Sequence, residues 1–177
     1  MGKEILFANQ IELEEYRKTI HSNLTKSLQK LTVVFESNDP VEAFDACKYD
    51  KIVFDPLTGQ NENLIEMLNQ YQTYLVTLKA VEYLLNKYPE KSFLARFGNI
   101  AGYDVESTDG EVIAECFAAV NFRNNQKLDK DLEKLDSVNR NVSCYEFFYD
   151  KVFEHKDCAL YETKFSGIQI VKFENLK

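Results

Sequence analysis

Two acidic side chains in the stretch GYDVESTDGEVIAECFAAV (residues 102–120) are candidates for metal-ion chemistry. Asp104 and Glu115 flank an Asp109-Gly110 pair, which favours a tight two-residue hairpin turn. With that turn, Asp104 lies directly opposite Glu115 on the neighbouring strand, with the Cβ atoms roughly 5 Å apart. Two carboxylates at this distance repel each other unless a cation lies between them.

A divalent cation would compensate this repulsion. Mg²⁺ is usually held by one or two carboxylates, with water and substrate phosphates completing its shell. Such an ion activates water and stabilises the charge that develops on a phosphodiester. The alternative is that the acids face solvent and only keep the sheet soluble. Ile113 and Phe117 share the face of Glu115 and argue against solvent exposure. The pair therefore predicts a Mg²⁺ site, with Mn²⁺ as a substitute, at Asp104 and Glu115.

The rest of the chain predicts helices and strands that would position this hairpin. Apolar spacing and turn signals predict four helices, over residues 9–31, 41–49, 62–88 and 127–136. Five further segments are strand-like, in addition to the two hairpin strands: residues 32–35, 51–54, 92–100, 143–149 and 167–173. This order predicts an α/β or α+β fold, with a mixed central sheet flanked by helices. Residues 1–60 form a mostly helical extension, and residues 61–177 form the core.

One acid interrupts the apolar stripe of the helix predicted at residues 62–88. The stripe reaches Leu78 and resumes at Leu85, and the intervening position is Glu82. A carboxylate on a buried stripe costs free energy unless it is paired. Either Glu82 reaches water near the helix end while Val81 fills the seam, or Glu82 points into a polar site.

These residues and their order resemble the PD-(D/E)xK nuclease superfamily, which has the restriction-endonuclease-like fold. In that family a helix precedes a strand hairpin, and a second helix and strand follow, as in residues 62–149 here. The resemblance implies that Asp104, preceded by Tyr103 rather than Pro, is the motif aspartate and that Glu115 is the second acid. It also implies that Glu82 is the additional helix carboxylate.

The sequence departs from the family at the motif lysine. That lysine stands two residues after the second acid, where this chain has Phe117. Some members carry it on the following helix instead, and NNQKLDKDLEKL (residues 124–135) offers candidates. Lys127 is our choice as the replacement, with Lys130 and Lys134 further along the same helix. The alternative is a solvated helix in which lysines pair with neighbouring acids.

Composition limits the function classes. The net charge of −8 over 177 residues argues against a protein that coats nucleic acid by bulk positive charge, although a local basic groove stays compatible with it. There is no apolar run of the roughly 18 residues that a membrane span needs. Four cysteines without a C-x-x-C pair are expected to be free thiols, those of Cys116 and Cys144 buried in strands. We expect a cytoplasmic protein with no membrane partner.

Two function hypotheses follow from the resemblance. The first is a Mg²⁺-dependent DNA endonuclease in which Asp104 and Glu115 bind metal, Glu82 and Lys127 assist catalysis, and Arg96 and Arg123 contact DNA phosphates. The second is an inactive nuclease fold that serves as a DNA-binding, protein-binding or assembly module. A homodimer joined through the N-terminal extension is compatible with both.

Overall fold

The computed structural model describes residues 2–37, 39–119, 126–138, 141–150 and 155–176. The chain divides into two compact units. One unit comprises residues 1–10 together with 75–177, and the other comprises residues 11–74. The division therefore differs from a boundary near residue 60, because the first residues of the chain belong to the sheet and the boundary falls inside a helix. No helix in the described part of the chain is both long and apolar enough to span a membrane.

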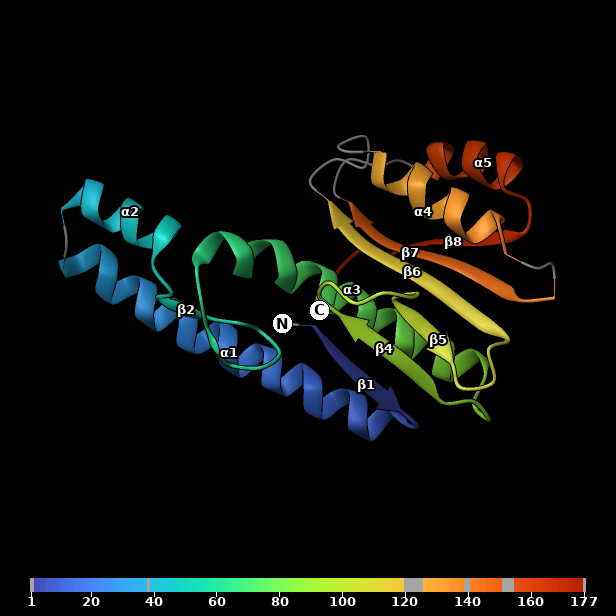
Figure 1. The fold of residues 1–177 in the computed structure, drawn as a ribbon, viewed down its shortest axis with the longest axis horizontal. Coiled ribbons are helices and arrows are strands. Elements are labelled where there is room, and N and C mark those ends of the chain that lie inside the picture. The colour runs from blue at the N-terminus through green and yellow to red at the C-terminus, as the bar shows by residue number, and fades with distance from the viewer. Residues whose placement is uncertain (1, 38, 120–125, 139–140, 151–154, 177) are drawn as a thin grey trace. The chain divides into compact units, whose positions relative to one another are not determined.

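The larger unit contains a six-stranded mixed sheet in the order β1-β4-β5-β6-β7-β8 (Figure 1). The strands are β1 Lys3–Phe7, β4 Phe93–Phe97, β5 Val105–Ser107, β6 Val112–Ala119, β7 Ser143–Asp150 and β8 Ile168–Lys172. The pairs from β1 to β6 are antiparallel, whereas β6, β7 and β8 run parallel. Parallel neighbours need crossover connections. These contain α4 (Lys127–Asp136) and α5 (His155–Lys164). The predicted mixed sheet flanked by helices is confirmed.

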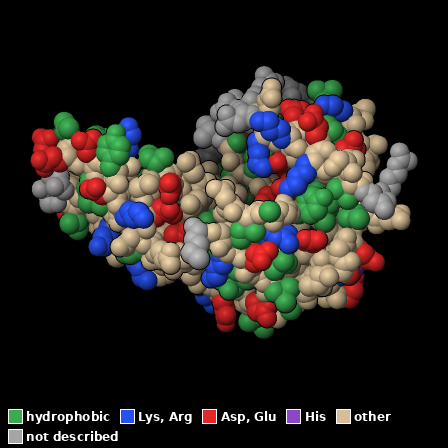
Figure 2. Space-filling model, viewed as in Figure 1, with side chains coloured by type: hydrophobic (Ala, Val, Ile, Leu, Met, Phe, Trp, Pro, Cys, Tyr) green, Lys and Arg blue, Asp and Glu red, His purple; other side chains and the backbone are tan. Residues whose placement is uncertain are grey.

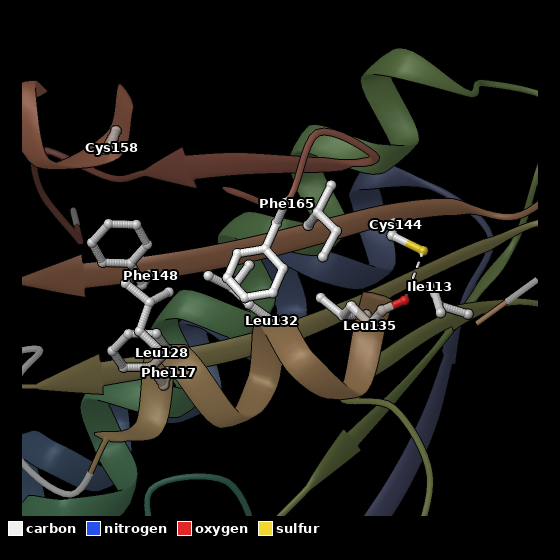
Figure 3. Close-up of a cluster of buried hydrophobic side chains, with 10 residues drawn as sticks. Ile113, Phe117, Leu128, Leu132, Leu135, Cys144, Phe148, Cys158 and Phe165 are labelled. Carbon is white, nitrogen blue, oxygen red and sulfur yellow. Dashed lines mark hydrogen bonds between the residues drawn. The ribbon is translucent and has the colours of Figure 1, made fainter. Parts of the chain in front are cut away.

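Strand alternation gives β6 and β7 two different faces. On one face, Ile113, Phe117 and Phe148 pack under α4 and α5 in a buried apolar cluster (Figure 3). On the other face, the ring of Tyr83, from α3 (Leu64–Lys87), lies 5.3 Å from the ring of Phe147. Helices thus cover both faces of the parallel strands, so a side chain pointing from β6 toward α4 is buried.

The β5–β6 hairpin has the predicted register but a wider turn. Val105 pairs with Ala114, and Glu106 pairs with Ile113, as an Asp-Gly turn requires. Among the described non-glycine residues only Gln126 has a positive φ, so the Asp109 half of the predicted turn is wrong. Of the two residues Asp109 and Gly110, only Gly110 takes the left-handed conformation, at φ 74°. Its N–H donates to the carbonyl of Ser107. The Asp109 carboxylate, which accepts from Ser107 and from the N–H of Glu111, stabilises this form.

The smaller unit is mainly helical. It contains most of α1 (Gln10–Ser37), α2 (Pro40–Tyr49), the short β2 (Val53–Phe54) and β3 (Asn61–Glu62), and the start of α3. The strand predicted at residues 32–35 is wrong, because α1 continues through this β-branched run. Asp39 caps α2 by accepting from the N–H of Val41, with Pro40 in the first turn, which confirms the helix predicted there.

Three elements escaped the sequence analysis: β1, α5 and the two-residue β3, which pairs with β2. β1 has only three apolar residues, but it pairs along its whole length with β4. α5 has weak amphipathic character, and the β7–β8 crossover rather than periodicity accounts for it. The four cysteines are free and buried, which confirms the thiols expected at Cys116 and Cys144.

Candidate functional site

Asp104 and Glu115 lie together at the α4-facing side of the hairpin. Asp104 precedes β5 and is half-buried, and its Oδ2 accepts from the backbone N–H of Cys116 at 2.8 Å. Glu115 stands in β6 with only 3% of its surface exposed. The predicted direct ladder pair between the two acids is not formed, because the Asp104 carboxylate takes an N–H of β6 and ends the strand pairing at Val105. After burial, the charge of Asp104 is the next cause that raises the pKa of Glu115.

Burial and the charge of Asp104 raise the pKa of Glu115 from its ordinary value of 4.5 to about 7. A salt bridge from the Lys134 ammonium to Glu115 Oε1 opposes this rise without cancelling it. Desolvation therefore dominates the environment of this carboxylate. A further positive charge beside Glu115 would therefore stabilise its ionised form.

A second carboxylate, Glu146, lies beside Glu115. The two residues are register partners on the parallel strands β6 and β7, so their side chains share the face under α4. Glu146 is 0% exposed, and neither of its carboxylate oxygens has a hydrogen-bond partner among the described residues. Burial, together with the charges of Asp131 and Glu115, raises the pKa of Glu146 well above its ordinary range.

Asp131 adds a fourth acid from α4. It is buried, and its Oδ1 pairs with the Lys127 ammonium at 2.6 Å, whereas its Oδ2 has no partner in the described part of the chain. Burial is the largest cause that raises its pKa. Asp104, Glu115, Asp131 and Glu146 are hereafter called the acidic cluster. The sequence analysis missed Asp131 and Glu146, although a lone acid inside the aromatic run SCYEFFY was a usable signal.

Two lysines of α4 neutralise part of this charge. Lys134 reaches Glu115, donates to the carbonyl of Gly102 at 2.7 Å, and lies 4.8 Å from the centre of the Tyr103 ring. Lys127, our choice from the sequence, pairs with Asp131 instead, one turn away on the same helix. The charges of Asp104 and Glu115 still contribute to the raised pKa of Lys127. The structure therefore gives Lys134 the direct contact with the second acid, and the role of Lys127 stays a prediction.

Phe117, two residues after Glu115, belongs to the apolar core. Its ring is buried in the cluster under α4 and stacks on Phe148, with 5.5 Å between the ring centroids. A lysine there would bury an ammonium among apolar side chains. The Lys134 side chain, which reaches Glu115 from α4, is instead 43% exposed.

The other predicted site residues lie apart or outside the described residues. Arg96, from β4, is held by Glu4 at 2.8 Å, by Glu106 at 3.0 Å and by the carbonyl of Tyr103, so its charge is already balanced locally. Arg123 lies outside the described residues. The half-buried Glu82 belongs to α3, which packs on the face of the sheet opposite Glu115, and Gln10 donates to its backbone carbonyl. Phosphate binding by these arginines and catalysis by Glu82 stay predictions.

The chemistry of the acidic cluster suits a hard cation with few protein ligands. Among the described residues, no three His, Cys, Asp or Glu side chains are arranged to hold a metal ion together. Two carboxylates suffice for Mg²⁺, which keeps several waters and uses substrate phosphates as further ligands. The metal role of Asp104 and Glu115 stays a prediction, since burial raises the pKa of Glu115 as it raises those of Glu146 and Asp131.

The raised pKa of Glu115 predicts that stability falls as pH rises. Between pH 4.5 and about 7 the folded state binds the proton more tightly than the unfolded state, so this stabilisation is complete below pH 4.5 and is lost through pH 7. A shift of this size corresponds to about 3 kcal/mol. Urea unfolding at pH 5, 6, 7 and 8 should show a decline that Glu115→Gln reduces. A wild-type protein with the same pH dependence as Glu115→Gln would contradict the prediction.

Comparison with protein-family models and with curated proteins found no match for this chain.

Proposed function

We propose that this protein is a Mg²⁺-dependent phosphodiesterase that acts on DNA and has a restriction-endonuclease-like core. The observation that carries the proposal is the buried Glu115 carboxylate, with the charge of Asp104 raising its pKa and the Lys134 ammonium bonded to it. A stable fold does not need a buried acid of this kind, and such acids concentrate at functional sites. The order α3–β4–β5–β6–α4–β7, with β6 and β7 parallel, supports the choice of fold.

Asp104 and Glu115 would hold the ion, and the ion would supply Lewis-acid stabilisation of a phosphoryl oxygen and a more acidic bound water. The N–H of Cys116 fixes one Asp104 oxygen at 2.8 Å, which leaves the other oxygen as the ligand. Glu115 is 3% exposed, so a bound ion would interact with its carboxylate in surroundings of low polarity. Glu146 and Asp131 would act on the charge of Glu115 rather than touch the ion.

Lys134 is the best-placed cation for the reacting phosphate. Its ammonium is fixed by Glu115 and by the carbonyl of Gly102. The Lys134 side chain is 43% exposed, which would let a phosphate oxygen approach it from solvent. It would stabilise negative charge as the phosphodiester is attacked. Lys127 would hold Asp131 and contribute at longer range.

Metal addition tests the proposal on the wild-type protein. We expect Mg²⁺ or Mn²⁺ to raise the melting temperature, and more strongly at pH 8 than at pH 6, because the ion needs ionised Glu115. In the same buffers, supercoiled plasmid should be nicked or linearised. Ca²⁺ is the matched control for binding without efficient cleavage. If neither metal raises the melting temperature or produces nicked or linear plasmid, the proposal fails.

Phe117 favours a second candidate function, an inactive fold that binds DNA or protein. The ring fills the position of the usual motif lysine and packs in the core. Under this alternative, metal binding survives and cleavage is absent. A melting-temperature increase with Mn²⁺, combined with intact plasmid, would favour it over the enzyme.

A further inference from the structure

We infer that the unit formed by residues 11–74 carries a self-association surface for a second copy of this chain. The acidic, apolar surface of α2 of one copy would dock into a lysine-rimmed groove on the other copy, and the reverse contact would complete a two-fold dimer. This inference does not depend on phosphodiesterase activity.

Exposed apolar side chains concentrate in this unit. The described residues include eleven large hydrophobic side chains that are exposed, and nine of them lie within residues 11–74. Phe44 and Val41 on α2 are each 69% exposed, and Phe35 near the end of α1 is 50% exposed. In Figure 2, apolar side chains emerge at several points on the surface of this unit. Contiguous apolar exposure marks an interaction surface, and the rings of Phe35 and Phe44 contact each other here.

A groove of about 710 Å³ lies between α1 and the segment that leads into β2. Its apolar lining includes Val33, Ile52 and Phe54. Lys26 and Lys30 from α1 and Lys51 after α2 stand around it, and no acid lines it. The Lys30 ammonium lies 6.0 Å from the centre of the Phe54 ring. The groove therefore suits an apolar ligand surface that carries negative charge.

The exposed surface of α2 has that character. Ala43 and Cys47 are buried, while the exposed apolar residues Val41 and Phe44 alternate along the chain with the exposed acids Glu42 and Asp45. The Phe44 ring meets Phe35 edge-on at 6.2 Å, which joins the apolar surfaces of the two helices. An amphipathic helix that lays such a surface into a groove is a common recognition mode.

Charge along the chain is self-complementary, which selects a second copy as the occupant. Residues 16–35 contain four basic residues and no acid, whereas residues 36–45 contain four acids and no base. In a two-fold dimer each contact occurs twice, so the acidic block of either copy can meet the basic block of the other. Opposite charges arranged in this way favour one register and oppose others.

Reciprocal charge reversal tests the inference by light scattering after size exclusion. We expect wild type to have the dimer mass and both Lys26→Glu/Lys30→Glu and Glu42→Lys/Asp45→Lys to fall to half that mass. An equimolar mixture of the two variants should return to the dimer mass, because only the mixed pair restores opposite charges. Phe44→Glu should also give the monomer mass. Circular dichroism checks that each variant is folded.

Lys130→Glu/Lys164→Glu is the matched control, since it makes the same change in net charge on exposed lysines of the other unit and should leave the dimer intact. A wild type that is monomeric at all concentrations overturns the inference, and so does a mixture that stays monomeric. The main alternative is that the groove binds nucleic acid, and titration with a labelled single-stranded oligonucleotide tests it. Binding by a monomeric wild type that is lost in Lys26→Glu/Lys30→Glu would assign the groove to nucleic acid instead.

Discussion

Glu115→Gln is expected to abolish metal-dependent cleavage and, at the same time, to stabilise the metal-free protein above pH 7. The amide keeps the shape of the side chain but removes a buried charge whose pKa is raised to about 7. Activity should fall by a factor on the order of 10³, because a neutral amide is a poor Mg²⁺ ligand and the ion supplies most of the charge stabilisation. The free energy of unfolding at pH 8 should rise by at most about 3 kcal/mol.

Asp104→Asn separates metal binding from the stability effect. The amide oxygen can still accept from the N–H of Cys116, so the hairpin should survive. We expect the loss of the melting-temperature gain with Mg²⁺ and the loss of plasmid cleavage. Glu111→Gln is the matched control on the same hairpin, since Glu111 is exposed and pairs with Lys91 at 2.8 Å. Full cleavage by Glu115→Gln or Asp104→Asn would refute the proposed site, whatever the change in stability.

Lys134→Ala is expected to reduce cleavage far more than Lys127→Ala. Lys134 contacts Glu115 directly, whereas Lys127 contacts Asp131. A positioned charge or proton donor contributes about 10²- to 10⁴-fold, so Lys134→Ala should lower kcat by a factor in that range. Loss of the Lys134 partner should also raise the pKa of Glu115 further, and so weaken Mg²⁺ binding below pH 7.

Three measurements distinguish catalysis from structure for Lys134. Lys134→Arg keeps the charge and should restore part of the activity, and Lys130→Ala on the same helix should leave it unchanged. The pH profile of Lys134→Ala should move to higher pH if Glu115 titrates as proposed. Equal losses in Lys134→Ala and Lys127→Ala would contradict the main role given to Lys134, and unchanged activity in both would exclude these two lysines from catalysis.

Local signals were sufficient where neighbouring residues dictated the structure. The Asp-Gly step predicted the β5–β6 register, and apolar spacing predicted α4 with its observed bounds. Alternation in β6 placed Glu115 on the same face as Ile113 and Phe117, and that face is buried. These features depend on turn chemistry and on the periods of strand and helix, both of which are written in a few adjacent residues.

Only the tertiary structure decided which charges meet. Glu146 joins Glu115 because β7 pairs parallel to β6, and Lys134 rather than Lys127 reaches Glu115 because α4 packs over that face. Likewise, β1 became part of the sheet through pairing with a strand some 90 residues away in sequence, and residues 32–35 stayed helical as the end of α1. The sequence by itself determined the acids of the hairpin, the main elements and the face of Glu115. Strand order, helix crossover and burial determined their partners, because the pKa of a buried charge depends on groups that are distant along the chain.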